Sequence, residues 1–192
     1  MLRVHGQLHC NGCMHLADEG KKDTNVKKVM DIWLLQMGYP VVTLSRDGNT
    51  VHAEQTRFIM DPNEEPNDKN YDMGYLWYVP VTYTDQSSMN FTDPVETWMD
   101  RGPADFNIPA SDDDWYLVNI NQNGFYRVKY EDANLDKLAT YLKEKDHKTI
   151  PVRTRSQLLE DAFSIANAHQ MDQVYSIYSK SRFHKMSKTQ NK

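Results

Sequence analysis

The sequence lacks long hydrophobic runs, clustered basic residues and a substantial number of cysteines. No stretch approaches the ~20 apolar residues that span a membrane, and polar residues interrupt the first sixteen positions, so no signal peptide is expected. Two cysteines among 192 residues leave the redox compartment open. The net charge of −5 is dispersed, and the one basic cluster, at 180–192, is interpreted as a frayed tail. Without clustered Lys and Arg, nucleic acid is not an expected partner.

The sequence contains no complete catalytic motif of the kinds considered. It contains no Gly-x-Ser-x-Gly elbow and no glycine-rich phosphate loop after a strand. His5 and His9 have the spacing of His-Glu-x-x-His, but Gly6 occupies the position of the Glu that acts as base. The third zinc ligand of such sites, a Glu nineteen residues after the second His, is replaced by Lys28. The sequence therefore predicts no catalytic residue.

Cys10 and Cys13 have the Cys-x-x-Cys spacing of half a zinc knuckle, with three histidines nearby. No second cysteine pair follows, and a thioredoxin-like motif needs a preceding strand and a following helix. We interpret residues 1–23 as an unassigned, disordered leader, and a metal or redox site there is the weaker alternative.

Acidic clusters and one sequon complete the candidate sites. Asp112–Asp114 and the group Asp61, Glu64 and Glu65 lack the alternating ligands and the Gly of a calcium loop, so they are interpreted as solvated turns. No metal ligand is predicted. Asn90-Phe91-Thr92 is an N-glycosylation sequon, which makes Asn90 a possible glycosylation site and points mildly to the secretory pathway.

The hydrophobic period changes twice along the chain. Apolar residues at helical spacing predict a helix over 24–38 with one apolar stripe, formed by Val26, Val29, Met30, Trp33, Leu34 and Met37. Gly38 and Pro40 end this helix. After residue 130 the helical period returns, with Leu135, Leu138, Ala139 and Leu142 on one face.

Between these helices the period is close to two. Strands are expected at 39–46, 50–60, 75–84, 95–99, 115–121 and 125–130. Asp47-Gly48-Asn49 and Asn123-Gly124 predict hairpin turns, and Pro80 predicts an edge position or a bulge. Five to seven short strands joined by such turns indicate a small antiparallel sandwich.

The last part of the sequence predicts the opening of a helical array. Thr154-x-x-Gln157 has the form of a capping box, a broad apolar face follows from Leu158, and residues 171–178 predict a further helix. The expected fold class is mixed β and α, a small antiparallel β-sandwich between a leading helix and the first helices of an α-solenoid-like domain. The expected domains are 1–23, 24–38, 39–130 and 131–192.

Three segments resemble the aminopeptidase N type (gluzincin) zinc metalloaminopeptidase family. Residues 29–43 are similar to the end of that family's catalytic domain, where Trp33, Gly38 and Pro40 fall in its motif. Residues 115–130 resemble the exit of its β-sandwich domain. Residues 155–166 resemble the helix that opens its C-terminal helical domain.

The resemblance implies a family activity, the removal of N-terminal residues from peptides with zinc as cofactor, and a plasma-membrane ectodomain or extracellular location. The family's zinc-binding and substrate-binding motifs are absent from this sequence. We therefore expect a noncatalytic fragment whose sandwich is a spacer between domains, with no cofactor of its own and peptide substrates only in the full-length family. Self-association through exposed helix faces is also expected. The alternative is a stand-alone protein-interaction module without enzymatic activity.

Overall fold

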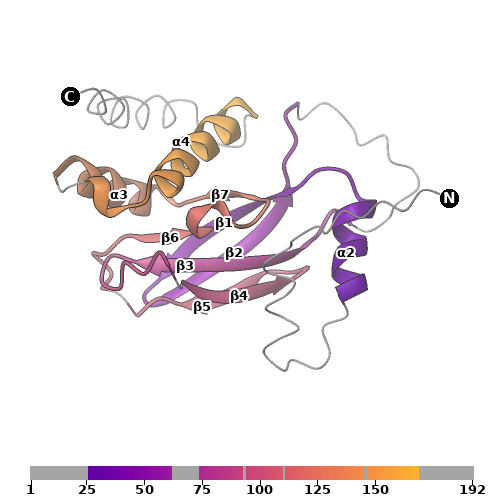
Figure 1. The fold of residues 1–192 in the computed structure, drawn as a ribbon, viewed down its shortest axis with the longest axis horizontal. Helices are drawn as coiled ribbons and strands as arrows, with labels where there is room; N and C mark the ends of the chain where they lie inside the picture. Colours follow the sequence, from indigo (N-terminus) through magenta and orange to yellow (C-terminus); the bar gives the residue numbers. More distant parts are fainter. Residues whose placement is uncertain (1–25, 62–73, 93, 110, 145–146, 169–192) are drawn as a thin grey trace.

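The computed structural model describes residues 26–61, 74–92, 94–109, 111–144 and 147–168 (Figure 1). The expectations for residues 1–23, for most of the polar loop at 61–72 and for the helix at 171–178 therefore lie outside the described residues. The elements are α2 (Val26–Leu35), β1 (Pro40–Asp47), β2 (Thr50–Arg57), β3 (Tyr78–Asp85), β4 (Val95–Asp100), β5 (Ala104–Asn107), β6 (Tyr116–Val118), η1 (Ile120–Gln122), β7 (Arg127–Lys129), α3 (Asp132–Glu144), η2 (His147–Thr149) and α4 (Val152–Asn167).

The strands form two sheets, in the orders β5-β2-β1-β7 and β4-β3-β6. The expected mixed fold with a small sandwich between helices is confirmed. One strand pair departs from the antiparallel expectation, since β7 runs parallel to β1. The hydrophobic core includes side chains from both sheets, among them Val42, Leu44 and Val51 from one sheet and Val79, Val81 and Met99 from the other. In Figure 1, α3 and α4 lie along one side of the sheets, and α2 stands at the end remote from α3.

The first predicted hairpin is confirmed. Asp47 pairs with Thr50, which leaves Gly48 and Asn49 as a two-residue loop. Gly48 has φ of 56°, in the left-handed region that such a turn requires. The returning strand is shorter than predicted and ends at Arg57.

The second predicted hairpin, at Asn123-Gly124, is wrong. β6 and β7 belong to different sheets, and the chain crosses between them through η1. The buried side chain of Asn119 holds this crossover, because its Oδ1 accepts from the Gly124 N–H at 2.8 Å and its Nδ2 donates to the Tyr126 carbonyl at 3.2 Å. Gly124 is needed for space, since a Cβ there would lie 2.1 Å from Cε1 of Tyr126.

Two further strand features differ from a simple reading of the sequence. β5 was not predicted, because its four residues are too few for a period of two to stand out. Pro80 lies in β3, the central strand of its sheet, but β6 pairs only with Tyr83–Asp85. At Pro80 the strand therefore has β4 as its single partner, as the expected edge position requires.

The stripe predicted for the first helix divides into two faces. Val29 of the stripe is buried on the sandwich together with Ile32, which was not part of the predicted stripe, whereas Leu34 and Met37 are 65% and 58% exposed. Met30 and Trp33 are partly buried, so the sandwich end covers one side of α2 and leaves Leu34 on the outward side.

The helices after the sandwich confirm one prediction and contradict another. All four apolar residues predicted for the face of α3 are buried. The capping box is wrong, because α4 begins at Val152 and places Thr154 inside the helix. There the Thr154 hydroxyl accepts from the Asn121 N–H at 3.3 Å, so it binds η1 rather than its own helix.

Candidate functional site

Most of the residues considered as metal or redox ligands fall outside the described part of the chain or on its surface. His5, His9, Cys10 and Cys13 are not described. Asp112 and Asp113 are exposed in a turn, as predicted. Across the described residues, no group of three or more His, Cys, Asp or Glu side chains is arranged to hold a metal ion. No described residue is therefore assigned as a zinc ligand.

A histidine–carboxylate pair joins β2 to β5. His52 Nδ1 lies 2.7 Å from Asp105 Oδ1, and both side chains are largely exposed. They are direct cross-strand neighbours in the ladder. Such an exposed pair contributes about 0.2–1 kcal/mol to strand pairing, so its position explains it as a structural contact.

Asn90 lies exposed in the loop that follows β3. The Thr92 hydroxyl donates to Asn90 Oδ1 at 3.3 Å, so the two side chains of the sequon lie next to each other. The loop is held from both sides: the Asn90 N–H donates to Thr84 Oγ1 at 2.9 Å, and Asn121 Nδ2 donates to the Phe91 carbonyl at 2.8 Å.

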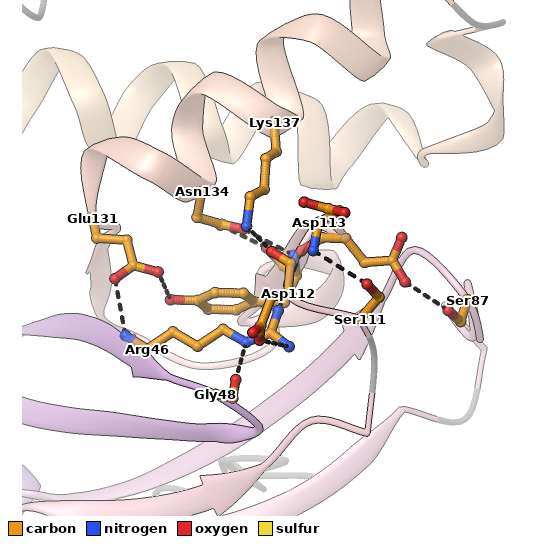
Figure 2. A network of polar contacts seen from close by, with 11 residues as sticks. Arg46, Gly48, Ser87, Ser111, Asp112, Asp113, Glu131, Asn134 and Lys137 are labelled. Carbon is orange, nitrogen blue, oxygen red and sulfur yellow. Dashed lines mark hydrogen bonds and ion pairs between the residues drawn. The ribbon is translucent and has the colours of Figure 1, made fainter.

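A polar network lies between α3 and the sandwich (Figure 2). Asn134 binds both backbone groups of Tyr116, accepting from its N–H at 3.0 Å and donating to its carbonyl at 2.9 Å. Tyr116 also donates its hydroxyl to Glu131 at 3.4 Å. Burial is the main cause that raises the pKa of Tyr116, so it remains a hydrogen-bond donor throughout the neutral range.

Arg46 extends this network to the β1–β2 turn. Its backbone N–H donates to Glu131 at 2.9 Å, and its guanidinium donates to the carbonyls of Gly48 and Asp114 at 2.6 and 3.2 Å. Lys137, three residues after Asn134 on the same face of α3, donates to the carbonyl of Asp112. Glu131, Asn134 and Lys137 thus form one polar stripe that binds β1, β6 and the turn before β6.

A second set of contacts joins α4 to β7. Asp161 is buried and accepts from the Val128 N–H at 3.1 Å and from Arg127 Nη1 at 3.1 Å. Gln157 Nε2 lies 3.4 Å from the same carboxylate. Burial raises the pKa of Asp161 to about 6, against the opposing effect of the Val128 N–H and Arg127.

Arg127 connects these contacts to an aromatic surface. Its guanidinium lies over the rings of Phe58 and Tyr39, at 5.1 and 5.6 Å from their centroids, and Nε donates to the Tyr39 hydroxyl at 3.2 Å. The Tyr39 and Phe58 rings stack at 5.2 Å. Arg127 therefore spans from α4 across β7 to the start of β1.

At the opposite end, α2 is fixed to the sandwich by two buried or partly buried polar side chains. Trp33 Nε1 donates to the Tyr78 carbonyl and Gln36 Nε2 donates to the Leu76 carbonyl, each at 3.0 Å. The Trp33 ring also packs on Trp77, with centroids 6.0 Å apart. Each flanking helix is thus held by side-chain bonds to backbone groups as well as by apolar packing.

These arrangements position helices and present no nucleophile with an adjacent base among the described residues that we could assign to catalysis. Composition and motif rules alone did not identify Arg46, Glu131, Asn134 or the pair of Arg127 and Asp161. For Arg127 and Asp161 a signal did exist, because both lie within segments that resemble known family motifs. None of the described helices is both long enough and apolar enough to span a membrane.

The fold is a β-sandwich with helices attached at both ends. Comparison with known proteins shows which family it resembles. Residues 115–174 match the family described as the ERAP1-like C-terminal domain. This match includes β6, β7, α3 and α4, so it joins the last strands of the sandwich to the helices that they bind.

The similar proteins are aminopeptidases. Human aminopeptidase N is 35% identical over 149 residues, which cover 77% of this chain and 15% of that protein. Mouse glutamyl aminopeptidase is 37% identical over 143 residues, covering 74% of this chain and 14% of its own length. Chicken aminopeptidase Ey is 34% identical over 168 residues, covering 82% and 16%.

The resemblance to the aminopeptidase N type family predicted from the motifs is confirmed. The chain spans about 15% of the length of the curated relatives that it matches. What it resembles is therefore one segment of an aminopeptidase.

Proposed function

We propose that this segment is a noncatalytic connector in a zinc-dependent aminopeptidase, in which the β-sandwich is a spacer that fixes the position of the domains on either side. The observation that carries the proposal is the double attachment of the sandwich. Trp33 and Gln36 bind α2 to backbone carbonyls at one end, and Asp161 binds α4 to β7 at the other. A rigid connector requires such bonds, because apolar packing alone is less directional.

Exposed apolar side chains on and beside the helices support the same role. Leu34 on α2 and Met37 just after it are exposed, and Phe125, 70% exposed, packs on Trp33. Val152 and Phe163 are exposed on α4. Exposed apolar groups of this kind are typical of surfaces that cover another domain or protein.

The activity of the whole protein follows from the relatives and is part of the proposal. Removal of N-terminal residues from peptides would be its reaction, with peptides as substrates and zinc as the metal that activates water. The zinc ligands would lie outside the described residues, since none of those is arranged to bind a metal.

A location at the cell surface or outside the cell, with a glycan on Asn90, completes the proposal. Asn90 is exposed and its Thr92 hydroxyl lies against its side-chain oxygen. Expression in a secreting cell and removal of N-glycans would test it: we expect a mass shift that Asn90→Gln abolishes and that Asn123→Gln retains.

The catalytic part of the proposal is tested with the purified chain and aminoacyl-anilide substrates in the presence of zinc. We expect no release of the amino acid. Chelator-sensitive turnover by homogeneous protein, lost on His5→Ala, would contradict the noncatalytic role.

The alternative is a stand-alone protein-interaction module, and the exposed face of α2 is the feature that favours it. Analytical ultracentrifugation of Leu34→Lys/Met37→Lys against the matched control Thr56→Lys/Ser156→Lys tests whether this face associates. Self-association that only the first variant abolishes supports an open face. A monomeric wild-type chain at high concentration would argue against exposed docking faces.

A further inference from the structure

The crossover between β6 and β7 contains the dipeptide Asn123-Gly124. In an Asn-Gly pair the backbone nitrogen of the glycine can attack Cγ of the asparagine side chain, because glycine has no Cβ to hinder the approach. The new C–N bond closes a succinimide ring, and the side-chain amide nitrogen leaves as ammonia together with the glycine N–H proton. Water then opens the ring to an aspartate or an isoaspartate. The reaction requires no enzyme, so the conformation of the dipeptide decides whether it occurs.

Asn123 is exposed to solvent, but its backbone conformation prevents ring closure. The ring forms only when the bond from the Asn123 carbonyl carbon to the Gly124 nitrogen is nearly eclipsed with the Cα–Cβ bond of Asn123. Asn123 has φ of −72° and ψ of −31°, a helical conformation in which these two bonds are far from eclipsed. The Asn123 N–H donates to the Ile120 carbonyl at 3.4 Å, and this turn holds the helical conformation.

The attacking nitrogen of Gly124 is also held in place. Its N–H donates to Asn119 Oδ1 at 2.8 Å, and rotation of the peptide toward the Asn123 side chain would break this bond. Gly124 lies against the Tyr126 ring, since a Cβ there would be 2.1 Å from Cε1. Tyr126 is 5% exposed, so its ring cannot move aside without disturbing the packed core. The folded crossover therefore keeps the nucleophile away from the Asn123 amide.

The crossover depends on α4 for this conformation. Asn119, Asn121 and Gln122 have positive φ, between 57° and 59°. Residues other than glycine keep such a conformation only where surrounding bonds enforce it. One of these bonds comes from α4, where the Thr154 hydroxyl accepts from the Asn121 N–H at 3.3 Å. Loss of this bond would let the segment relax toward conformations that permit ring closure.

We propose that Asn123 is a site of spontaneous deamidation whose rate is set by the packing of α4 on the crossover. While α4 is packed, the amide persists; when α4 separates, the Gly124 nitrogen attacks and the change is permanent. An isoaspartate adds a methylene to the backbone, so the crossover can no longer present the Gly124 N–H to Asn119. Separation of α4 is thus recorded in the covalent structure of the chain. The reaction requires neither the connector role nor a peptidase activity, because it needs only this dipeptide and water.

The experiment follows the Asn123 peptide by mass spectrometry while the full chain is incubated at mildly alkaline pH, either folded or unfolded in guanidinium chloride. We expect the folded wild type to convert Asn123 at least about tenfold more slowly than the unfolded chain, because the reaction requires local opening. Asn11-Gly12 is the same dipeptide, so in guanidinium chloride it should react at a similar rate. Asn123→Gln, whose longer side chain does not close this ring, identifies the product. A folded wild type that reacts as fast as the unfolded chain overturns the proposal.

Substitutions at Thr154 test the part that α4 plays. Thr154→Val removes the hydroxyl that binds Asn121, so the folded variant should convert Asn123 about fivefold faster than the wild type, as the loss of one buried hydrogen bond predicts. Thr154→Ser keeps the hydroxyl and should remain close to the wild type. If Thr154→Val does not fold, Thr154→Ala gives the same comparison.

Thr84→Val is the matched control, because it removes a similarly buried hydroxyl that binds the Asn90 N–H instead of the crossover. It should leave the rate at Asn123 unchanged. An acceleration by Thr84→Val equal to that by Thr154→Val would show that general stability, and not α4, sets the rate. That result overturns the proposal, as does a Thr154→Val variant that reacts no faster than the wild type.

Discussion

Replacing Asp161 with asparagine separates the effect of burial from the effect of ion pairing at the junction of α4 and β7. The substitution keeps the shape and removes the charge. Breaking a buried ion pair costs about 3–5 kcal/mol when the remaining charge is stranded. Arg127 is not stranded here, because it also bonds to Tyr39 and lies over two aromatic rings.

The raised pKa of Asp161 is the net effect of burial and of its bonds to Arg127 and Val128. Its folded-state pKa is about 6, against an ordinary value of 3.8. The difference of about 2 units corresponds to roughly 3 kcal/mol, by which the folded protein disfavours the ionised form at neutral pH. This net value already includes the attraction of Arg127. Asn keeps an acceptor for the Val128 N–H but can turn an N–H donor toward Arg127, which offsets the gain from removing a buried charge. We therefore expect Asp161→Asn to change the free energy of unfolding by less than about 1 kcal/mol at pH 7.5.

The pH dependence of the stability difference between the wild type and Asp161→Asn shows whether burial or Arg127 dominates. Because the folded state binds the Asp161 proton more tightly than the unfolded state, the stability that this group contributes is greatest below pH 4 and is lost as the pH rises to 6. Between pH 7.5 and pH 5 the wild type should gain about 1.4 kcal/mol relative to Asp161→Asn.

Urea unfolding followed by circular dichroism at both pH values measures this difference. Glu54→Gln, which removes a carboxylate from an exposed position of β2, is the control and should show no such pH-dependent difference. If the wild type instead loses stability relative to Asp161→Asn on acidification, Arg127 dominates over burial and the reasoning is refuted.

Four further substitutions, at three positions, test the contacts that shape the sandwich and the attachment of α2. Gly124→Ala should lower the free energy of unfolding by at least about 2 kcal/mol, because its Cβ would lie 2.1 Å from Tyr126 Cε1. A Cβ at Gly48 would have no atom within 4 Å, so Gly48→Ala is opposed only by the positive φ and should cost about 1–2 kcal/mol. A loss at Gly48 equal to or larger than that at Gly124 would contradict the steric explanation. Trp33→Ala should cost about 2–3 kcal/mol in urea unfolding and Trp33→Phe about 1 kcal/mol less, because Trp33 is partly buried and Phe keeps most of the packing but loses the bond to Tyr78. Equal losses for the two Trp33 variants would show that the packing of the ring adds nothing, because both variants lack the bond to Tyr78.

The sequence predicted elements whose signal is local. The turn at Gly48 and the buried face of α3 depend on backbone conformation or on spacing within one element. Gly38 has the positive φ expected of a helix stop, but α2 itself already ends at Leu35, three residues earlier than predicted. The crossover at Asn119 could not be predicted in this way. Asn123-Gly124 has the composition of a hairpin turn, but Asn119 bonds to Gly124 and Tyr126 and directs the two strands into different sheets.

The candidate site was less accessible to sequence reasoning for the same reason. Thr154 and Gln157 have the spacing of a capping box, and nothing local distinguishes that from a Thr that binds Asn121 of a neighbouring element. Arg127 and Asp161 are 34 residues apart. Their contact depends on the packing of a helix on a strand, which no local pattern reveals. Only the resemblance of both segments to one family indicated that the two residues belong to the same folded unit.

The placement of β7 explains why the sandwich and the following helices act as one unit. β7 is only three residues long, and its one partner strand is β1, with which it pairs in parallel. So short an edge strand gains little from its ladder alone. The Asp161 carboxylate adds a bond to the Val128 N–H in the middle of this strand, and Arg127 carries the contact back to the start of β1. Movement of α4 away from the sandwich would therefore release β7 as well, so α4 transmits its position to the sheet. A connector that holds neighbouring domains at a fixed distance requires this coupling.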